Sequence, residues 1–295
     1  MKKVVVIGGS GFLGSYVSDE LSRRGYDVTV ADIKESEYLQ HNQRFEYVDI
    51  MNSENIREII KGANIVYNFV SVANIDDAIH DPVGAVNLNV VGHLNLLELC
   101  VQNKKIERFV YASSAYALSG EGSFYGITKQ TAEKLTEEYF NRHGLKYTII
   151  RYGSLYGERP SPNNYIYNLL ERAIQTGSLE YKGGDSDIRE YIHSADAARL
   201  SVDVLEDIQY ENEYIILTGI EKFKRIELLN MIDEIMQGKL EIKKVSENNL
   251  GHYKITPYVY HPAIAKKLVA NPFIDIGQGI VECIQTIYKL KSGAK

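Results

Sequence analysis

Short runs of apolar residues alternate with stretches of helical periodicity through the first half of the chain. The runs are rich in β-branched residues, which is typical of strands buried on both faces of a parallel sheet. The predicted strands are residues 3–7, 27–31, 45–50, 65–70, 108–114 and 146–151. The predicted helices are residues 15–24, 54–61, 82–102 and 125–143. Strict alternation with short links predicts an α/β fold with a doubly wound parallel sheet of the Rossmann type.

The pattern changes after Gly157, where a loop rich in proline and asparagine leads into less regular elements. We therefore predict two domains, residues 1–156 for the sheet and residues 157–295 for a smaller α/β substrate domain. Segments of the second domain are expected to return to the first.

One long helix, residues 82–102, has apolar side chains at helical spacing. The predicted buried face consists of Val86, Val90, Leu94, Leu97 and Val101. Cys100 lies on the apolar side and is interpreted as a buried small hydrophobic residue. The chain has only one other cysteine, Cys283, so a disulfide framework is excluded.

Three glycines, Gly8, Gly11 and Gly14, connect the first strand to the first helix. Glycine at these positions allows a tight turn, a close approach of backbone to a pyrophosphate, and close packing of the helix on the strand. The helix N-terminus would add unpaired N–H groups and a partial positive charge. The motif therefore predicts a dinucleotide-binding loop.

Acidic residues follow two of the next strands. Asp32 ends the strand at residues 27–31, at the position where a carboxylate meets the adenosine ribose hydroxyls and repels a 2′-phosphate. This favours NAD over NADP, and the alternative is an ordinary loop residue. Asp49 is predicted either to touch the adenine edge or to cap the helix that begins near Ser53.

Composition limits the possible partners. The net charge of -6, the pI near 5.7 and the lack of basic runs argue against nucleic-acid binding. We also expect no bilayer-spanning stretch, no signal peptide and a cytoplasmic location. The seven histidines have no ligand spacing, so no metal site is predicted.

The candidate reactive residues are Tyr125 and Lys129, which lie four positions apart and therefore on one face of a predicted helix. A lysine ammonium, a helix N-terminus and an oxidised nicotinamide ring each favour the phenolate. We therefore expect the pKa of Tyr125 to lie well below its usual value near 10. Ser114, at the end of a strand, would hydrogen-bond a substrate oxygen, and its alternative role is a turn cap.

Several segments together resemble one enzyme family. They are residues 3–14, Asp32, Asp49, Asn89, residues 113–115, residues 125–129 and residues 151–157. The chain is similar to the extended short-chain dehydrogenase/reductases, and within them to the nucleotide-sugar epimerases typified by UDP-glucose 4-epimerase.

The resemblance implies NAD as cofactor, with Tyr125 and Lys129 also touching the nicotinamide ribose. The implied NAD contacts are Gly8, Gly11, Phe12, Leu13, Gly14, Asp32, Asp49, Ile50, Phe69, Ala73, Asn89, Tyr125 and Lys129. It also places Arg189 on the diphosphate of a nucleotide-sugar substrate, the alternative being an ion pair with Glu190 or Asp187.

The chain departs from the family at three places. The loop between Ser114 and Tyr125 is short, and Ser154 stands where the family has a substrate-contacting asparagine. The second phosphate-binding arginine expected just before residues 258–262 is missing, and Lys254 and Arg159 are the candidates to replace it.

The departures also bear on the reaction. Ala115 and Tyr116 occupy the positions where related dehydratases and decarboxylases have acidic residues, which disfavours both reactions. The hypothesis is a redox-neutral epimerisation: Tyr125 takes the 4-hydroxyl proton, C4 loses hydride to NAD, and hydride returns to the other face of a 4-keto intermediate. The alternatives are an NAD(P)H-dependent 4-keto-sugar reductase and a non-catalytic dinucleotide-binding protein.

In the resembling family, helices equivalent to residues 84–102 and 125–142 pair across a two-fold axis. The expectation is therefore a homodimer joined by a four-helix bundle.

Overall fold

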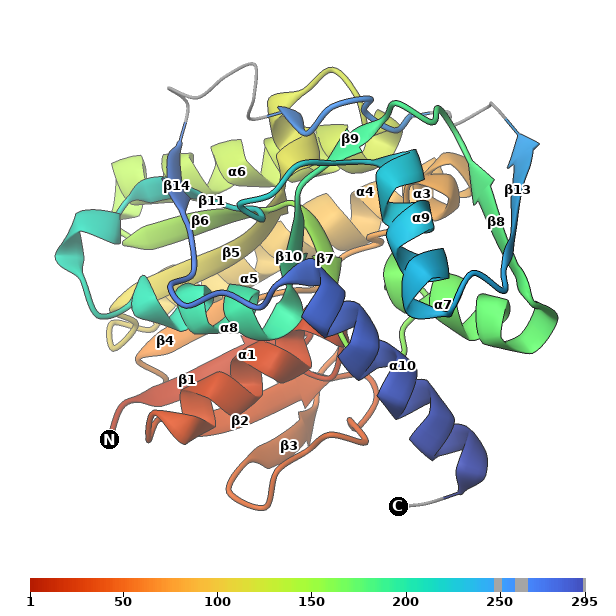
Figure 1. Ribbon diagram of the computed structural model, residues 1–295. Helices are drawn as coiled ribbons and strands as arrows, with labels where there is room; N and C mark the ends of the chain where they lie inside the picture. The colour runs from red at the N-terminus through yellow and green to blue at the C-terminus, as the bar shows by residue number, and fades with distance from the viewer. Residues whose placement is uncertain (247–250, 258–264, 294–295) are drawn as a thin grey trace.

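The computed structural model describes residues 1–295 except 247–250, 258–264 and 294–295. Its described part contains an eight-stranded parallel sheet in the order β3–β2–β1–β4–β5–β6–β11–β14 (Figure 1). The strands are β1 (Lys3–Ile7), β2 (Asp27–Asp32), β3 (Arg44–Tyr47), β4 (Ile65–Asn68), β5 (Arg108–Ser114), β6 (Tyr147–Tyr152), β11 (Glu213–Leu217) and β14 (Lys266–Leu268). The predicted doubly wound α/β fold is confirmed.

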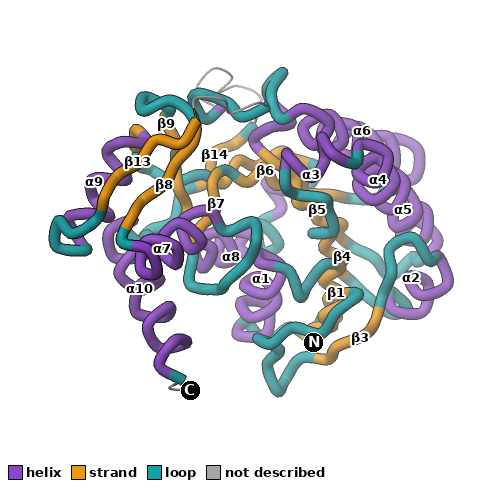
Figure 2. Tube along the Cα trace, turned by 90° about the vertical axis from the view of Figure 1, so that its right-hand side faces the viewer, coloured by secondary structure: helices purple, strands orange, loops and turns teal. Residues whose placement is uncertain are grey.

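Helices cover both faces of this sheet (Figure 2). Val4 and Val6 of β1 point to the layer of α1 (Phe12–Arg23) and α8 (Ser194–Asp203). Val5 and Ile7 point to the opposite layer. That layer holds α2 (Ser53–Ile59), α5 (His93–Gln102) and α6 (Ser123–His143). Since successive strand residues face opposite sides, a strand covered on both sides must be apolar at every position.

The predicted helix 82–102 is a composite of α4 (Pro82–Val86), a π-helical segment η1 (Asn87–Gly92) and α5. The predicted buried face is confirmed for Leu97, Leu94 and Val101, which lie in or against the core. It is wrong at Val86, which is 41% exposed, and it missed the buried polar Asn89 and His93. A π segment adds residues to a turn and so shifts the faces that a regular 3.6-residue period would give. Cys100 is buried, as predicted.

The same helix corrects the expectation that no stretch could span a bilayer. By length and composition alone, its 21 residues are long and apolar enough to cross a membrane. Leu96 and Leu97 pack it into the core beside the sheet, and this packing accounts for its apolar composition.

A second core lies at the C-terminal side. It is built around buried Leu170, Leu229 and Ile280. Its elements are α7 (Tyr165–Thr176), β8 (Ser178–Lys182), α9 (Arg225–Ile235), β13 (Glu241–Ser246) and α10 (Ile276–Ser292). Two small ribbons connect it to the sheet: β7 (Ser154–Tyr156) with β10 (Tyr191–His193), and β9 (Ile188–Arg189) with β12 (Phe223–Lys224). Strands β11 and β14 of the main sheet come from beyond residue 157, and the boundary at 156/157 stays a prediction.

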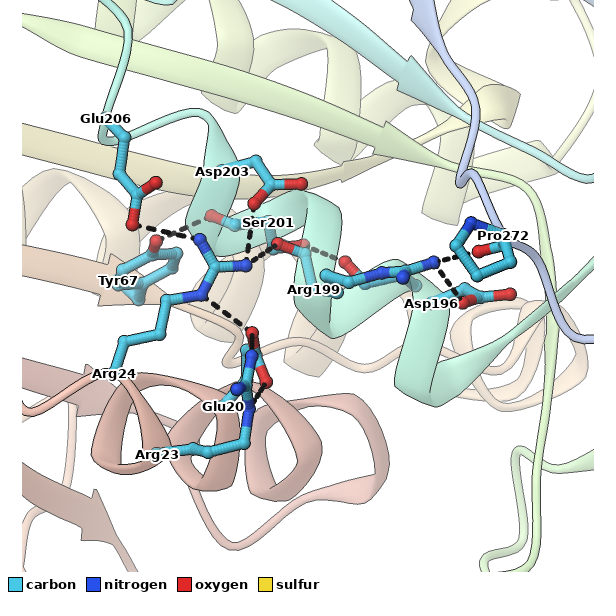
Figure 3. A network of polar contacts seen from close by, with 11 residues as sticks. Glu20, Arg23, Arg24, Tyr67, Asp196, Arg199, Ser201, Asp203, Glu206 and Pro272 are labelled. Atoms are coloured by element: carbon cyan, nitrogen blue, oxygen red, sulfur yellow. Dashed lines mark hydrogen bonds and ion pairs between the residues drawn. The ribbon is translucent and has the colours of Figure 1, made fainter.

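An ion-pair network holds α1 against α8 (Figure 3). Arg24 pairs with Glu20 on its own helix and with Asp203 and Glu206 near the end of α8. Asp203, the last residue of α8, and Glu206, just beyond it, are partly exposed, so each pair contributes little to stability. The network matters to the site because α1 begins at the glycine loop.

Candidate active site

The glycine loop is packed too tightly for side chains. A Cβ on Gly14 would lie 2.2 Å from the carbonyl oxygen of Gly8, and Gly8 itself has a φ of +79°. Helix α1 begins at Phe12, three residues before the predicted start. Its N-cap, Gly11, offers no side-chain cap to the first N–H groups. The helix N-terminus is therefore open to an anion.

Two polar groups beside this loop suit a dinucleotide. The Ser10 hydroxyl is buried without a hydrogen-bond partner in the described structure. The Asp32 carboxylate accepts hydrogen bonds from Ser10 N at 3.0 Å and Ile33 N at 2.7 Å. Burial raises the pKa of Asp32, and the backbone donors oppose this. An orphan donor at the helix terminus and a carboxylate at the strand end fit a pyrophosphate and a ribose diol.

Other predicted cofactor contacts are spread along the same sheet edge. Phe69, just past β4, stacks on Tyr67 with ring centroids 5.9 Å apart, and Ala73 follows in the next loop. Leu13 and Ile50 are buried, whereas Phe12 is partly exposed at the start of α1.

Asp49 and Asn89 have specific structural partners. Asp49 accepts a hydrogen bond from Met51 N, and Asn52 caps α2, so the alternative role of Asp49 as that cap is wrong. The Asn89 amide accepts from Val72 N and donates to Val72 O and Thr128 Oγ1. Asn89 therefore fixes the segment after β4 against α6.

Helix α6 brings the predicted reactive residues together. It begins at Ser123 after Gly122, two residues earlier than predicted, and this places Tyr125 in its first turn. Tyr125 and Lys129 are both buried, and Lys129 Nζ lies 5.7 Å from the Tyr125 ring centroid. Ser114 lies beside Tyr125, and its Oγ accepts from Tyr116 N as the cap of η2 (Ala115–Leu118).

The electrostatics of this group differ from the prediction. Burial raises the pKa of Tyr125 to about 12, although the hydrogen bond from Ser114 opposes the shift. Burial also lowers the pKa of Lys129 to about 7, against the attraction of Glu133. In the chain alone, desolvation disfavours both charged forms and outweighs the attraction of Lys129 and the helix terminus. The expected fall of the phenol pKa with a nicotinamide ring bound stays a prediction.

A buried ion pair behind Lys129 was missed by the sequence analysis. Glu133 accepts from Arg151 Nε at 2.8 Å and from Arg151 Nη2 at 2.7 Å, and the Ser113 hydroxyl donates to it at 2.6 Å. These bonds join β5, β6 and α6 around the reactive group. The available signal was Glu133 four residues after Lys129, on the same helix face.

Arg189 is only 7% exposed and has unusual surroundings. Its Nη1 donates to the carbonyl oxygens of Ile188 and Lys254, and its guanidinium lies 4.3 Å from the Tyr253 ring centroid. Within the described residues no ion pair joins it to a carboxylate, which contradicts the alternative of a pair with Glu190 or Asp187. Glu190 pairs with Lys267, and Asp187 pairs with Arg225.

Residues 251–257 cover this side of the site, which no sequence signal indicated. The Tyr116 hydroxyl and His252 Nδ1 are 3.0 Å apart, and the Tyr116 and Tyr253 rings are 4.4 Å apart. Ser154 Oγ lies 3.4 Å from the Tyr253 hydroxyl. Tyr116 and Tyr253 are far apart in sequence and meet only through the fold.

The two candidates for the missing arginine differ in position. Arg159 packs against the rings of Tyr16 and Tyr38 and pairs with Asp19, so α1 and the loop after β2 occupy its guanidinium. The Lys254 side chain is exposed. The run 258–262 lies outside the described residues.

One group of described residues has metal-ligand chemistry: Glu158, His193 and Glu282, whose ligand atoms lie within 4.8 Å of one another. However, His193 Nδ1 accepts a hydrogen bond from Ala195 N, which puts the proton of the neutral ring on Nε2. Nε2 is the atom that faces Glu158, at 3.4 Å, and in this tautomer it cannot ligate a metal. His193 Nε2 is buried without a hydrogen-bond partner in the described structure, and the absence of a metal site stays a prediction.

Comparisons with known proteins agree with this geometry. The sequence profile of the NAD dependent epimerase/dehydratase family matches residues 4–216. A Methanocaldococcus jannaschii protein with the provisional name UDP-glucose 4-epimerase is 28% identical over 233 residues, covering 72% of this chain and 75% of that protein. A UDP-glucuronate 4-epimerase of Thermodesulfobacterium geofontis is 26% identical over 311 residues, covering 94% and 93%.

The fold is also shared with solved structures. A Bacillus cereus UDP-glucuronic acid 4-epimerase in complex with UDP-glucuronic acid and NAD superposes with a TM-score of 0.82. It is 21% identical, and the match covers 98% of this chain and 99% of that one.

Proposed function

The chain belongs to the NAD-dependent epimerase/dehydratase family, and from this premise we propose that it is an NAD-dependent nucleotide-sugar epimerase that inverts C4. The observation that carries the proposal is the buried group of Ser114, Tyr125 and Lys129 at the carboxyl edge of the sheet. The same edge carries the open N-terminus of α1. The relatives named as epimerases of UDP-glucose and UDP-glucuronate support UDP as the nucleotide.

In the proposed reaction the chain moves one proton in each direction. When bound, NAD supplies the acceptor that takes hydride from C4 and returns it. Tyr125 acts as its phenolate, which the charge of Lys129 stabilises; it removes the proton of the sugar 4-hydroxyl and becomes the neutral phenol. Ser114 donates to the sugar oxygen while the 4-keto sugar turns over. Tyr125 then returns the proton to the oxygen of the inverted carbon.

Elimination and decarboxylation are less well supported. An elimination needs an acid and a base near C5 and C6 of the sugar, whereas the two residues after Ser114 are Ala115 and Tyr116. The Tyr116 hydroxyl contacts His252, and burial raises its pKa further above its usual value. The pair of carboxylates that would supply the acid and the base is therefore absent from these two positions.

The surroundings of Arg189 support a phosphorylated substrate. A buried guanidinium without a carboxylate partner is unfavourable unless a bound anion balances its charge. The planar fork of arginine suits the oxygen atoms of a diphosphate. Arg189 and the nearby Ser154 are therefore our proposed substrate contacts.

The test is Tyr125→Phe, assayed by interconversion of UDP-glucose with UDP-galactose and of the corresponding UDP-uronic acids. Loss of the proton carrier should lower kcat by about 10²- to 10⁴-fold while NAD remains bound. The matched control is Tyr139→Phe, on the same helix as Tyr125, which removes a phenol that bonds Glu98 of α5 and should keep near-normal kcat. Full turnover by Tyr125→Phe would exclude the proposed role.

Consumption of added NADH distinguishes the reductase alternative from the proposed epimerase. An epimerase keeps its cofactor and consumes no added NADH, whereas a reductase oxidises one NADH for each keto sugar reduced. Asp32, at the position expected for the ribose, favours NAD over NADP and therefore favours the epimerase.

We also propose a cytoplasmic homodimer. Helix α6 packs against α4 and η1, and this surface exposes the apolar side chains of Val83, Val91 and Ile127. An apolar patch shared by neighbouring helices supports pairing with a second copy across a two-fold axis.

A further inference from the structure

The β9–β12 ribbon presents two arginines on one face. Its strands are antiparallel, with Phe223 opposite Arg189, and the pairing continues because Arg225 N donates to Asp187 O at 2.9 Å. Alternate residues of a strand share a face, so Asp187 and Arg189 lie on the same side as Phe223 and Arg225. Lys224 points to the other side.

Arg225 is incompletely satisfied on that face. Its side chain is 10% exposed, and its Nη2 lies 3.3 Å from Asp187 Oδ2. The Nη1 atom donates to the Tyr165 hydroxyl at a long 3.4 Å, and Nε is buried without a hydrogen-bond partner in the described structure. A buried N–H without an acceptor is unfavourable and therefore marks a place for one.

The charges of the face do not balance. Arg189 has no carboxylate partner among the described residues, and Arg225 has Asp187 alone. Two guanidinium groups thus face one carboxylate, which leaves one positive charge in a largely buried setting. Burial lowers the pKa of His252; the charges of Arg189 and Arg225 add to the shift, and those of Asp76 and Asp187 oppose it.

We propose that Arg225 is a second diphosphate-binding residue, acting with Arg189 on the two phosphate groups of the nucleotide sugar. Asp187 holds the Arg225 guanidinium in place and weakens its pull on the ligand. The inference rests on the proposed function, since it assigns one more contact to the same substrate. It also gives a source within α9 for the arginine that is missing just before residues 258–262.

The experiment is calorimetric titration of UDP into the NAD-loaded enzyme, which leaves the dinucleotide site filled. Arg225→Gln should weaken UDP binding by about 10- to 100-fold, as expected for loss of a charged hydrogen bond. The KM for the UDP-sugar should rise similarly while kcat changes little. Lys224→Gln, the neighbouring cation on the opposite face, is the control and should bind UDP like the parent enzyme.

The substitution Asp187→Asn should change UDP affinity in the opposite direction. Removing the competing carboxylate should tighten UDP binding several-fold, whereas a purely structural role of the Arg225–Asp187 pair predicts unchanged or weaker binding in both variants. If Arg225→Gln fails to retain NAD, the Asp187→Asn titration decides the question alone. In that case tighter binding supports the proposal, and unchanged or weaker binding overturns it.

Failure of the inference is distinguishable from failure of the proposed function. If Arg189→Gln weakens UDP binding and Arg225→Gln does not, the substrate class stands and Arg225 is excluded from the site. If the parent enzyme binds neither UDP nor any other nucleoside diphosphate, the proposed function itself fails.

Discussion

At the scale of single residues, Lys129 shows how a reactive group can oppose stability. Its ammonium is buried, donates to Ala112 O at 2.8 Å, and has no ion-pair partner in the described structure. Its folded pKa of about 7 lies below the unfolded value of about 10.4. The unfolded chain therefore binds more protons between these values, and stability rises with pH across that window.

We predict that Lys129→Met stabilises the protein at pH 7 by about 1–4 kcal/mol while abolishing turnover, because an apolar side chain of similar size removes a buried charge. The gain should shrink as the pH rises from 7 towards 10, where the parent lysine is neutral in both states. Urea unfolding of nucleotide-free protein across this pH range measures the effect.

The matched control is Lys134→Met, on the same helix but exposed and paired with Glu137. It should change stability by less than about 0.5 kcal/mol, with no comparable pH dependence. A Lys129→Met protein less stable than the parent at pH 7 would contradict the charge argument.

The residue types of the site could be predicted from the sequence, but their proton affinities could not. The spacing of Tyr125 and Lys129 already places both on one helix face. Their pKa values depend on desolvation by the packed sheet and by residues 251–257, which local sequence does not encode. The same holds for Arg189, whose unpaired state follows from the separate partners of Asp187 and Glu190.

At the scale of elements, the β1–α1 unit depends on the absence of side chains. We predict that Gly14→Ala weakens NAD binding by at least 10-fold and destabilises the fold by about 1–3 kcal/mol, since its Cβ would overlap Gly8 O and displace the turn. Fluorescence titration with NAD and thermal unfolding measure both effects.

Gly120→Ala is the control for this substitution, because a Cβ there meets no atom within 4 Å. It should bind NAD normally and unfold at nearly the parent temperature. Equal behaviour of the two variants would show that the close packing at Gly14 does not matter for the cofactor.

The composite helix from Pro82 to Gln102 marks the limit of pattern-based prediction for an element. Its existence and the apolar face of its C-terminal part were predictable, but the face before residue 92 was not, because the π segment at residues 87–92 shifts the register. The buried polar residues also have partners on other elements: Asn89 bonds Thr128, and His93 contacts Asn68 and Thr136. A hydrophobic pattern cannot reveal polar residues that are buried because the fold satisfies them.

At the scale of the whole molecule, the exposed apolar surface of α4, η1 and α6 is the proposed dimer contact. We predict that Ile127→Glu, at a side chain now 60% exposed, converts the dimer to a monomer, because it would place a charge in an apolar contact. Sedimentation or light scattering at micromolar concentration measures the change.

Ile208→Glu is the corresponding control, since Ile208 is also highly exposed but lies outside this surface, in η3 (Ile208–Tyr210). It should leave the assembly unchanged. A parent protein that is monomeric at these concentrations would rule out the dimer.

The sequence by itself determined the sheet from β1 to β6, the glycine loop, Asp32 and the spacing of Tyr125 and Lys129, whereas β11 and β14 were not predicted. Each depends on strand and helix periodicity or on the backbone freedom of glycine, which are properties of short segments. Only the tertiary structure decided which charges are buried, that residues 251–257 lie over Tyr116 and Arg189, and that Arg225 shares a face with Arg189. Those features arise from contacts between segments far apart in the chain, whose burial and electrostatic fields exist only once the core has formed.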